Sequence, residues 1–376
     1  MIIKDATMLT TAIAIFLFVG TVAAQQTDFP IQCLSLPSQK SIAKNDMPKT
    51  PEQGAADKLV AEAQAEMRVP SGDNTTKAIS LAEKAIRSDP KNVAAYVLLA
   101  RVHVQSQRYL SVPKKIAVQR AWENLSKARA LDPENIDGLH LLADQVIANN
   151  QDYKCAKKIL ETALKLDPQN ARSNYYYSQI LSGMGKFDAA FRYADKAIAV
   201  ADADSRNFVV VNAGRARYMG GQYDWVLDHY AKYLESNPNY WLAHFYRSLA
   251  FGAKGQFQEA LVEAKRSMPV IKGGDAGGVA MLALAYANAG QKEQARELLN
   301  ELLGRDARGE HVVEYRIAAV YEILGERDEA FRWLNKDIDD RDGLGSWLVW
   351  LNHDPVWKSA RKDPLQRNTK AGWLVN

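Results

Sequence analysis

Apolar residues recur at helical spacing along most of the chain, and glycine and proline return between them at a regular interval. The stripe Val279, Leu282, Ala283 and Tyr286 has the i, i+3, i+4, i+7 spacing of one face of an amphipathic helix. A glycine follows that stripe, and a second stretch of helix-forming residues comes after it. The pattern predicts an all-α chain built from repeated helix–turn–helix units.

The repeat length can be measured between prolines. The phrase Ala-x-x-x-Asp-Pro ends at Pro90, Pro133 and Pro168, and Pro238 closes a similar stretch. Pro133 and Pro168 lie 35 positions apart, and Pro168 and Pro238 lie 70 apart, which is twice 35. The 43 positions from Pro90 to Pro133 require an insertion of eight or nine residues. We expect this insertion to form a bulge or a lengthened loop around Pro113.

A second set of positions repeats in the same register. Five glycines are each followed, five residues later, by a small or β-branched apolar residue: Gly185 and Ala190, Gly221 and Val226, Gly255 and Ala260, Gly290 and Ala295, Gly325 and Ala330. Each glycine is expected to end the first helix in the left-handed conformation. Each small residue is expected where two helices cross closely, and the following proline stops the second helix.

The repeat resembles the tetratricopeptide repeat family, whose signature is Trp-x2-Leu-Gly-x2-Tyr, then Ala-x3-Phe, then Pro. One unit carries this pattern at Val210, Ala213, Gly214, Arg217, Val226, Tyr230 and Pro238. We count seven or eight units, which start near residues 59, 93, 137, 171, 207, 241, 276 and 311. The resemblance implies a right-handed superhelical solenoid over residues 53–340, with the first unit serving as an N-terminal cap.

The end of the chain resembles the closing segment of many bacterial tetratricopeptide proteins. The resemblance rests on Ala330-Phe331-Arg332-Trp333-Leu334, Asp354-Pro355, Arg361 and Asp363-Pro364, although Leu365-Gln366 stands where Arg-Phe is usual. Residues 341–376 are therefore predicted to form a C-terminal capping segment. Its apolar side chains would cover the open face of the last repeat, because terminal repeats need a cap for solubility. They are Trp347, Leu348, Trp350, Leu351 and Trp357.

The first residues have the features of an export signal. Lys4 precedes an uncharged stretch over residues 6–27, and Val22-Ala23-Ala24 supplies small residues for cleavage after Ala24. An uncleaved membrane anchor is the alternative, since 22 uncharged residues are just enough to span a bilayer. Residues 1–24 are thus predicted to be a signal peptide or an anchor, and residues 25–52 a linker. We expect an exported protein of the bacterial cell envelope, periplasmic or secreted, or anchored in the inner membrane by residues 6–27.

Composition narrows the classes of function. The 48 basic and 44 acidic residues give a net charge of +4, which is too small an excess to indicate a nucleic-acid-binding surface. Cys33 and Cys155 are the two cysteines, too few for a disulfide scaffold or a four-thiolate zinc site. In an oxidising compartment they would either pair with each other or remain two unpaired thiols.

The sequence contains no recognisable catalytic or metal-binding motif. The six histidines are scattered without a His-x-x-x-His pair, and neither a phosphate-binding loop nor a Gly-x-Ser-x-Gly elbow occurs. The acidic run at residues 337–343 fails the calcium-loop spacing, because Ile338 would occupy position one. We therefore expect no catalytic residue, metal site or cofactor. An enzyme assembled from isolated polar groups is the remote alternative.

Helical periodicity places a second stripe on the first helix of each unit, apart from the stripe that packs on the second helix. The resemblance implies that this stripe lines a concave groove. The members that we predict to bind a partner are Arg172, Tyr175, Gln179, Phe208, Arg215, Tyr218 and Phe245. Tyrosine and arginine are enriched at interface hot spots. The alternative is that these residues pack between adjacent repeats, with Tyr175 touching Phe208.

These observations favour a non-catalytic scaffold that binds a protein or peptide in the groove. The carboxylate clamp by which some relatives hold chaperone tails needs Lys and Asn, and Tyr175, Gln179 and Phe208 depart from it. A membrane-tethered sensor or assembly factor that recruits partners is the alternative function.

Overall fold

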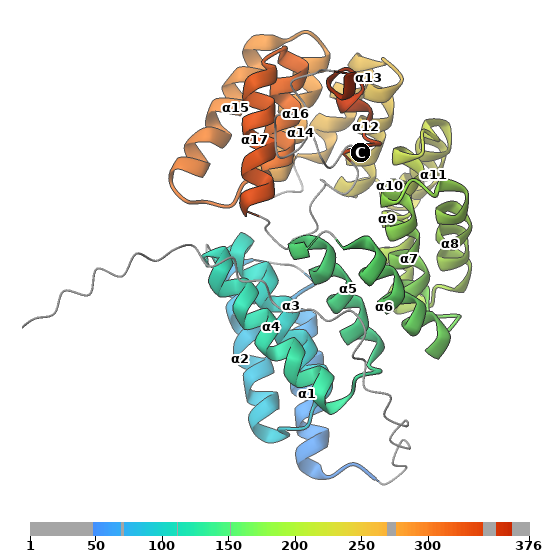
Figure 1. The fold of residues 1–376 in the computed structure, drawn as a ribbon, viewed down its shortest axis with the longest axis vertical. Helices are drawn as coiled ribbons and strands as arrows, with labels where there is room; N and C mark the ends of the chain where they lie inside the picture. The colour runs from blue at the N-terminus through green and yellow to red at the C-terminus, as the bar shows by residue number, and fades with distance from the viewer. Residues whose placement is uncertain are drawn as a thin grey trace, which may run out of the picture. The chain divides into compact units, whose positions relative to one another are not determined.

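The structure is a computed structural model that describes residues 48–68, 71–110, 112–150, 152–268, 276–340 and 351–362. The regular structure of these residues is helical, and they contain no strand (Figure 1). The α-helices are α1 (Pro51–Glu66), α2 (Gly72–Ser88), α3 (Val93–Leu110), α4 (Lys114–Leu131), α5 (Ile136–Asn150), α6 (Tyr153–Leu166), α7 (Ala171–Gly183), α8 (Phe187–Val200), α9 (Ala203–Asn212), α10 (Gly214–Met219), α11 (Tyr223–Ser236), α12 (Trp241–Ala253), α13 (Phe257–Ser267), α14 (Ala276–Asn288), α15 (Lys292–Ala307), α16 (Glu314–Leu324) and α17 (Arg327–Asp340). The 3-10 helices η2 (Pro355–Trp357) and η3 (Ala360–Lys362) follow.

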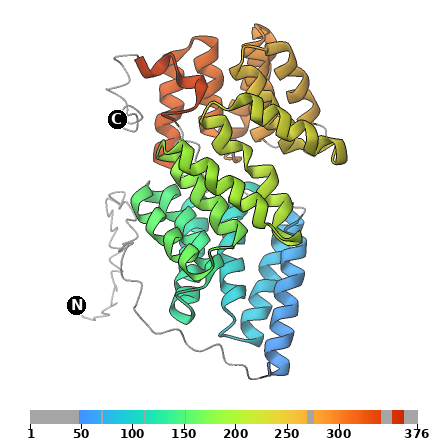
Figure 2. The same ribbon diagram turned by 90° about the vertical axis from the view of Figure 1, so that its right-hand side faces the viewer.

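Consecutive helices pack as hairpins, as Figures 1 and 2 show for α1/α2, α3/α4, α5/α6, α7/α8, α12/α13, α14/α15 and α16/α17. First helices of neighbouring hairpins also contact each other, for example α3 with α5, α12 with α14 and α14 with α16. Each hairpin buries its apolar face against the next, so the core runs along the stack. The predicted all-α, tetratricopeptide-like fold is confirmed for the described residues.

The glycine turns are confirmed. All five predicted glycines have left-handed backbone angles, with φ of 70° at Gly185, 76° at Gly221, 75° at Gly255, 77° at Gly290 and 85° at Gly325. The partner positions five residues later are at most 2% exposed, which is the burial expected at a close helix crossing. A side chain with a Cβ strains this backbone conformation, so glycine recurs there.

The recurring Asp-Pro phrase ends the second helices. Asp89, Asp132 and Asp167 are the C-caps of α2, α4 and α6. Each carboxylate accepts a hydrogen bond from the backbone N–H two residues later, at 2.9–3.0 Å. This Asx-turn redirects the chain while the adjacent proline prevents further helix. The phrase therefore marks both the end of one hairpin and the approach to the next.

The insertion near Pro113 lengthens helices instead of a loop, so the predicted bulge or long loop was wrong. α3 and α4 each have 18 residues, whereas α7 has 13 and α8 has 14. Pro113 is the N-cap of α4. Proline suits this place because it supplies no N–H that the helix would need.

The first helix near residue 207 is broken into α9 and α10. The hydroxyl of Tyr230, from α11, accepts a hydrogen bond from the Gly214 N–H at 3.1 Å and donates one to the Val211 carbonyl at 2.5 Å. The Tyr230 hydroxyl thus interrupts the backbone hydrogen-bond ladder of the helix, while Ala213 at the junction keeps helical dihedral angles. The helix–turn–helix unit predicted to start near residue 207 did not include this break.

α1 begins at Pro51, inside the stretch predicted as linker. Thr50 and Gln53 form a capping box, in which each side chain accepts from the backbone N–H of the other residue. Pro51 occupies the first helical position, where its missing N–H costs nothing. The remainder of the predicted signal or anchor and linker, up to residue 47, lies outside the described residues.

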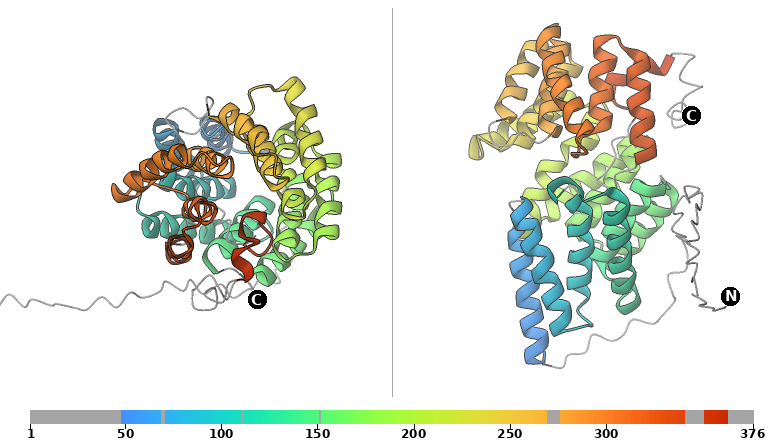
Figure 3. Two further views of the ribbon diagram at one scale, coloured as in Figure 1. Left: turned by 90° about the horizontal axis from the view of Figure 1, so that it is seen from above. Right: turned by 90° about the vertical axis from the view of Figure 1, so that its left-hand side faces the viewer.

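Part of the predicted C-terminal cap is described. Trp347, Leu348 and Trp350 lie outside the described residues, whereas Leu351 and Trp357 are buried in the same apolar cluster as Tyr315 of α16. The indole N–H of Trp357 donates to the Tyr315 hydroxyl at 2.9 Å. The segment 351–362 therefore packs on the last hairpin, as a cap would (red in Figure 3).

Candidate partner-binding surface

The predicted groove residues lie on the first helices of consecutive hairpins. Arg172, Tyr175 and Gln179 are on α7, Phe208 is on α9, Arg215 and Tyr218 are on α10, and Phe245 is on α12. These helices are neighbours, because α7 contacts α9 and α10, and α10 contacts α12. The structure thus places the predicted residues on a connected row of helices.

An aromatic cluster joins α7 to α9. The ring of Phe208 lies 5.0 Å from that of Tyr175, edge to face, and 6.0 Å from that of Tyr176. The guanidinium of Arg172 lies 5.6 Å from the centre of the Phe208 ring, within the range of a cation–π contact. Phe208 and Arg172 are both half-buried, so this pair offers an apolar face beside a positive charge.

Arg215 provides a second cation on the same row of helices. Its Nε donates to the Tyr246 hydroxyl at 3.1 Å. Burial alone would lower the pKa of Arg215. The neighbouring phenols of Tyr246 and Tyr175 raise the pKa by more, so the net shift is upward. Arg215 therefore stays a half-buried cation held in one place by α12.

Burial divides the seven predicted residues into two groups. Tyr175, Gln179, Tyr218 and Phe245 are buried, with at most 8% of each residue exposed. Packing between repeats, the alternative raised above, fits Tyr175, whose ring lies 5.0 Å from that of Phe208. The Tyr218 hydroxyl instead donates a hydrogen bond to Asp354 of the C-terminal segment at 3.3 Å. Arg172, Phe208 and Arg215 are half-buried and present side-chain surface that a partner could contact. Partner binding by these residues stays a prediction.

Asp137, His140 and Ser173 form a grouping like that of a serine hydrolase, which the sequence search missed because it joins two hairpins. His140 Nε2 lies 2.8 Å from Ser173 Oγ, and His140 Nδ1 lies 3.8 Å from an Asp137 oxygen. The second distance is too long for a hydrogen bond. Ser173 is fully buried, so its hydroxyl has no access to a substrate in this structure. The grouping links α5 to α7 and has no geometry for acyl transfer.

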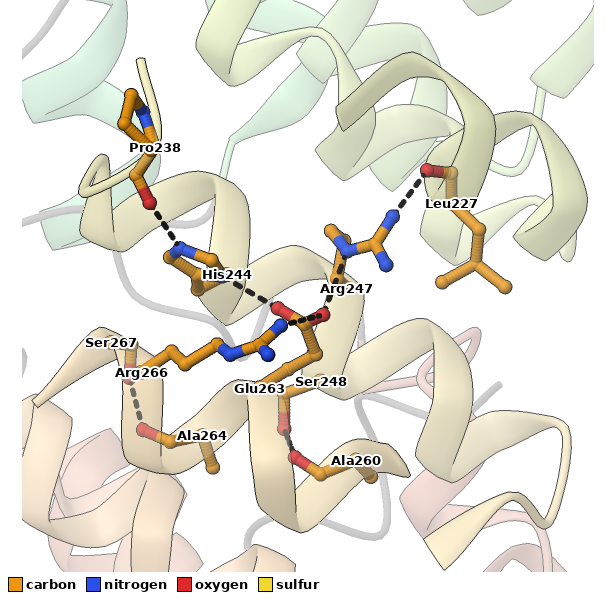
Figure 4. Close-up of polar contacts among 10 residues, drawn as sticks. All are labelled: Leu227, Pro238, His244, Arg247, Ser248, Ala260, Glu263, Ala264, Arg266 and Ser267. Carbon is orange, nitrogen blue, oxygen red and sulfur yellow. Dashed lines mark hydrogen bonds and ion pairs between the residues drawn. The ribbon is translucent and has the colours of Figure 1, made fainter. Parts of the chain in front are cut away.

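A second polar cluster lies between α12 and α13 (Figure 4). The buried carboxylate of Glu263 lies 2.6 Å from His244 Nδ1 and accepts a hydrogen bond from Arg247 Nε at 3.1 Å. Arg266 approaches the same carboxylate at 3.6 Å. A second nitrogen of Arg247 donates to the Leu227 carbonyl at 2.8 Å, which ties α11 to this hairpin. Such pairing compensates for the burial of the charge.

The Glu263 cluster borders a pocket of about 520 Å³. Phe251, Leu261 and Val262 provide its apolar lining, and Gln291, at the start of α15, closes one side. Sequence reasoning found neither the cluster nor the pocket, because histidine, arginine and glutamate on amphipathic helices resemble ordinary surface positions. The one feature of the sequence that could have indicated the cluster is the spacing of His244 and Arg247, which lie three residues apart and therefore on one face of a helix.

Cys155 is buried in the first turn of α6, and Cys33 lies outside the described residues. Their pairing stays a prediction. A count of free thiols on the non-reduced, unfolded protein tests it: we expect none, and two would contradict the disulfide.

The described residues hold no group of three or more His, Cys, Asp or Glu side chains arranged for a metal ion. Among the same residues, every helix is either too short or too polar to traverse a bilayer. Residues 6–27, predicted as signal or anchor, are outside that search.

Comparison with known proteins supports the repeat assignment. Residues 278–308, which comprise nearly all of the α14/α15 hairpin, match the family model described as tetratricopeptide repeat. None of the curated proteins matches the sequence significantly.

Solved structures share the fold at low sequence identity. Yeast Tom70 is 18% identical with a TM-score of 0.50, over 85% of this chain and 68% of that one. The Cut9–Hcn1 hetero-tetramer of the APC/C contains a chain that is 15% identical with a TM-score of 0.52, over 87% of this chain and 56% of that one. This chain therefore spans little more than half the length of the second relative. Residues 278–308 therefore match one tetratricopeptide repeat, and the described residues have the fold of tetratricopeptide repeat structures.

Proposed function

We propose that the chain is a non-catalytic scaffold of the bacterial cell envelope that binds a protein or peptide on its row of first helices. The observation that carries the proposal is that Arg172, Phe208 and Arg215 are half-buried on neighbouring first helices, with Arg172 over the Phe208 ring and Arg215 hydrogen-bonded to Tyr246. Such a surface suits a segment with acidic and apolar side chains, because charge complementarity and aromatic burial act together. The structure of similar fold that contains Cut9 and Hcn1 is a hetero-tetramer, that is, an assembly of proteins with one another.

The experiment compares partner capture by two full-length variants. Arg172→Glu with Phe208→Ala changes the proposed surface, whereas the control Arg192→Glu changes an exposed charge on α8. Proteins crosslinked to the chain in intact cells are identified by mass spectrometry, and circular dichroism checks that each variant is folded. We expect the surface variant to lose partners that the control keeps. Equal recovery by both variants would exclude this surface.

Tethering to the membrane is the second candidate, and the uncharged run over residues 6–27 favours it. A tethered chain would recruit its partners to the bilayer. N-terminal sequencing of the mature protein separates the two candidates, because a chain that begins at Gln25 has lost the anchor.

An enzymatic function has less support. The Asp137, His140 and Ser173 grouping is the nearest to a catalytic arrangement that we find among the described residues, and its serine is buried.

A further inference from the structure

The segment 351–362 contacts hairpins that are far apart in the sequence. The Asp354 carboxylate is 1% exposed and accepts hydrogen bonds from the Tyr315 hydroxyl at 2.9 Å and the Tyr218 hydroxyl at 3.3 Å. Tyr315 belongs to α16 and Tyr218 to α10. Two whole hairpins, α12/α13 and α14/α15, separate these helices along the chain. One carboxylate therefore bridges the middle and the end of the array.

The donors around Asp354 are suited to a carboxylate. Burial, followed by the negative charge of Asp354, raises the pKa of both phenols well above the ordinary value, so they remain donors. Arg316 is 2% exposed and packs over Phe245, 4.9 Å from the ring centre. Burial lowers the pKa of Arg316, and the charge of Asp354 opposes this shift. The array thus supplies two hydroxyl donors to the carboxylate, and the charge of the buried Arg316 interacts with that of Asp354.

Trp357 fills the apolar part of the same site. Its side chain is 1% exposed, and its ring lies 5.8 Å from that of Tyr315 at 65°. The Tyr315 hydroxyl accepts a hydrogen bond from the Trp357 indole N–H and donates one to the Asp354 carboxylate. Tyr315 therefore contacts both residues of the segment. The spacing between carboxylate and indole is set by Pro355 and by the turn of η2.

The other edge of the segment lies against the α7/α8 turn. The His353 ring meets that of Phe187 edge to face at 4.9 Å. A Cβ on Gly185 would approach the His353 ring to 3.2 Å, so the glycine leaves room for this contact. Arg361 donates to the carbonyls of Leu351 and Asp354 at 3.1 Å each, which holds the segment in its own fold.

A cap for the last hairpin alone would not need these contacts with α10 and the α7/α8 turn. A buried carboxylate is costly unless donors surround it. One donor to Asp354 is the Val356 N–H of its own segment, at 3.1 Å, and the two tyrosine hydroxyls come from separate hairpins. Tyr218 is also one of the residues that the periodicity placed on the predicted groove. The segment thus lies where a bound peptide is expected.

We propose that Tyr218, Tyr315 and Arg316 form a binding site for a segment of the type Asp-Pro-x-Trp, and that residues 351–362 of this chain are its resident occupant. The inference rests on the proposed function as a peptide-binding array. It specifies one kind of segment that the array binds, with an aspartate carboxylate followed by a tryptophan. The site is distinct from the Arg172 and Phe208 surface.

A fluorescent peptide with the sequence of residues 351–362 tests the site in the full-length protein. The receptor is the Trp357→Ala chain, whose own segment has lost its apolar anchor. We expect saturable binding by fluorescence anisotropy, at least tenfold tighter than to the wild-type chain, in which the resident segment competes. The same peptide with Asp354→Asn should bind at least tenfold more weakly, because it lacks the anion.

Trp333→Ala is the matched control, since Trp333 is an equally buried tryptophan on α17 outside the proposed site. It should bind the peptide no better than wild type. If the Trp357→Ala chain loses its helical circular dichroism and is therefore not folded, the full-length Asp354→Asn chain serves as the receptor. We expect it, too, to bind the peptide at least tenfold more tightly than the wild-type chain does. A folded receptor that binds no peptide would overturn the proposal and make the segment a plain cap. That result would leave the capture experiment on Arg172 and Phe208 unaffected.

Discussion

His103 on α3 is a buried histidine, and its burial makes the array sensitive to acid. It is 6% exposed, and burial, together with the nearby charge of Arg120, lowers its pKa to about 4. In the unfolded chain the pKa returns to about 6.5. Between these values the unfolded state binds more protons than the folded state, so stability is lost as the pH falls from about 6.5 to about 4.

We expect His103→Gln to remove part of this acid sensitivity. From pH 7.5 to pH 4.5 the free energy of unfolding of the wild type should fall further than that of the variant, by on the order of 1–3 kcal/mol. Urea denaturation of both proteins at the two pH values measures the difference. The comparison between pH values cancels the packing cost of the substitution and the titration of groups common to both proteins. Equal losses would show that His103 does not titrate with folding.

Residues that determine the turns were predictable, because each acts locally. Gly185 and its four equivalents need the left-handed conformation, and Asp89 and its equivalents bind the backbone two residues away. Neither effect depends on distant contacts. The burial of Tyr175 and Tyr218 was not predictable in the same way. Helical periodicity shows which face of a helix a residue lies on, but it does not show which other part of the chain covers that face. Asp354 covers Tyr218 from 136 residues away.

At the scale of elements, the break between α9 and α10 depends on a close approach at Gly214. A Cβ at this residue would lie 2.3 Å from the Tyr230 hydroxyl, and Tyr230 is completely buried. We expect Gly214→Ala to destabilise the protein by about 1–3 kcal/mol, the usual cost of overpacking, despite the better helix propensity of alanine. Chemical denaturation measures this change.

Gly252→Ala, within α12, is the matched control. A Cβ there would meet only the Ala260 Cβ, at 4.0 Å, which is an ordinary contact. The control should be neutral or more stable by up to about 1 kcal/mol. If the two substitutions have the same effect, Tyr230 does not fix the break.

The lengths and breaks of helices were less predictable than their existence. Pro113 looked like part of a loop and is a helix cap, and Pro51 looked like part of a linker and starts α1. In both cases proline is compatible with two structures, and the neighbouring residues decide between them. The role of the Tyr230 hydroxyl could not be anticipated, because an aromatic residue at the phenylalanine position of the repeat signature normally indicates packing alone.

At the scale of the whole molecule, the bridge from Asp354 to Tyr218 changes how the array should loosen. In a stack held only by neighbouring contacts, weakening one end spreads from repeat to repeat. Here the weakening can reach α10 directly, since the C-terminal segment contacts α10 and α16 together. In the Trp357→Ala chain, we expect amide hydrogen exchange in α16 and α10 to speed up by at least tenfold, while α13 and α3 change little. Mass spectrometry of peptic fragments resolves these helices. A loss of protection that declines steadily from α16 through α14 and α12 to α10 would instead show that neighbouring contacts alone transmit the change, and that the hydrogen bond to Tyr218 contributes little to the stability of the stack.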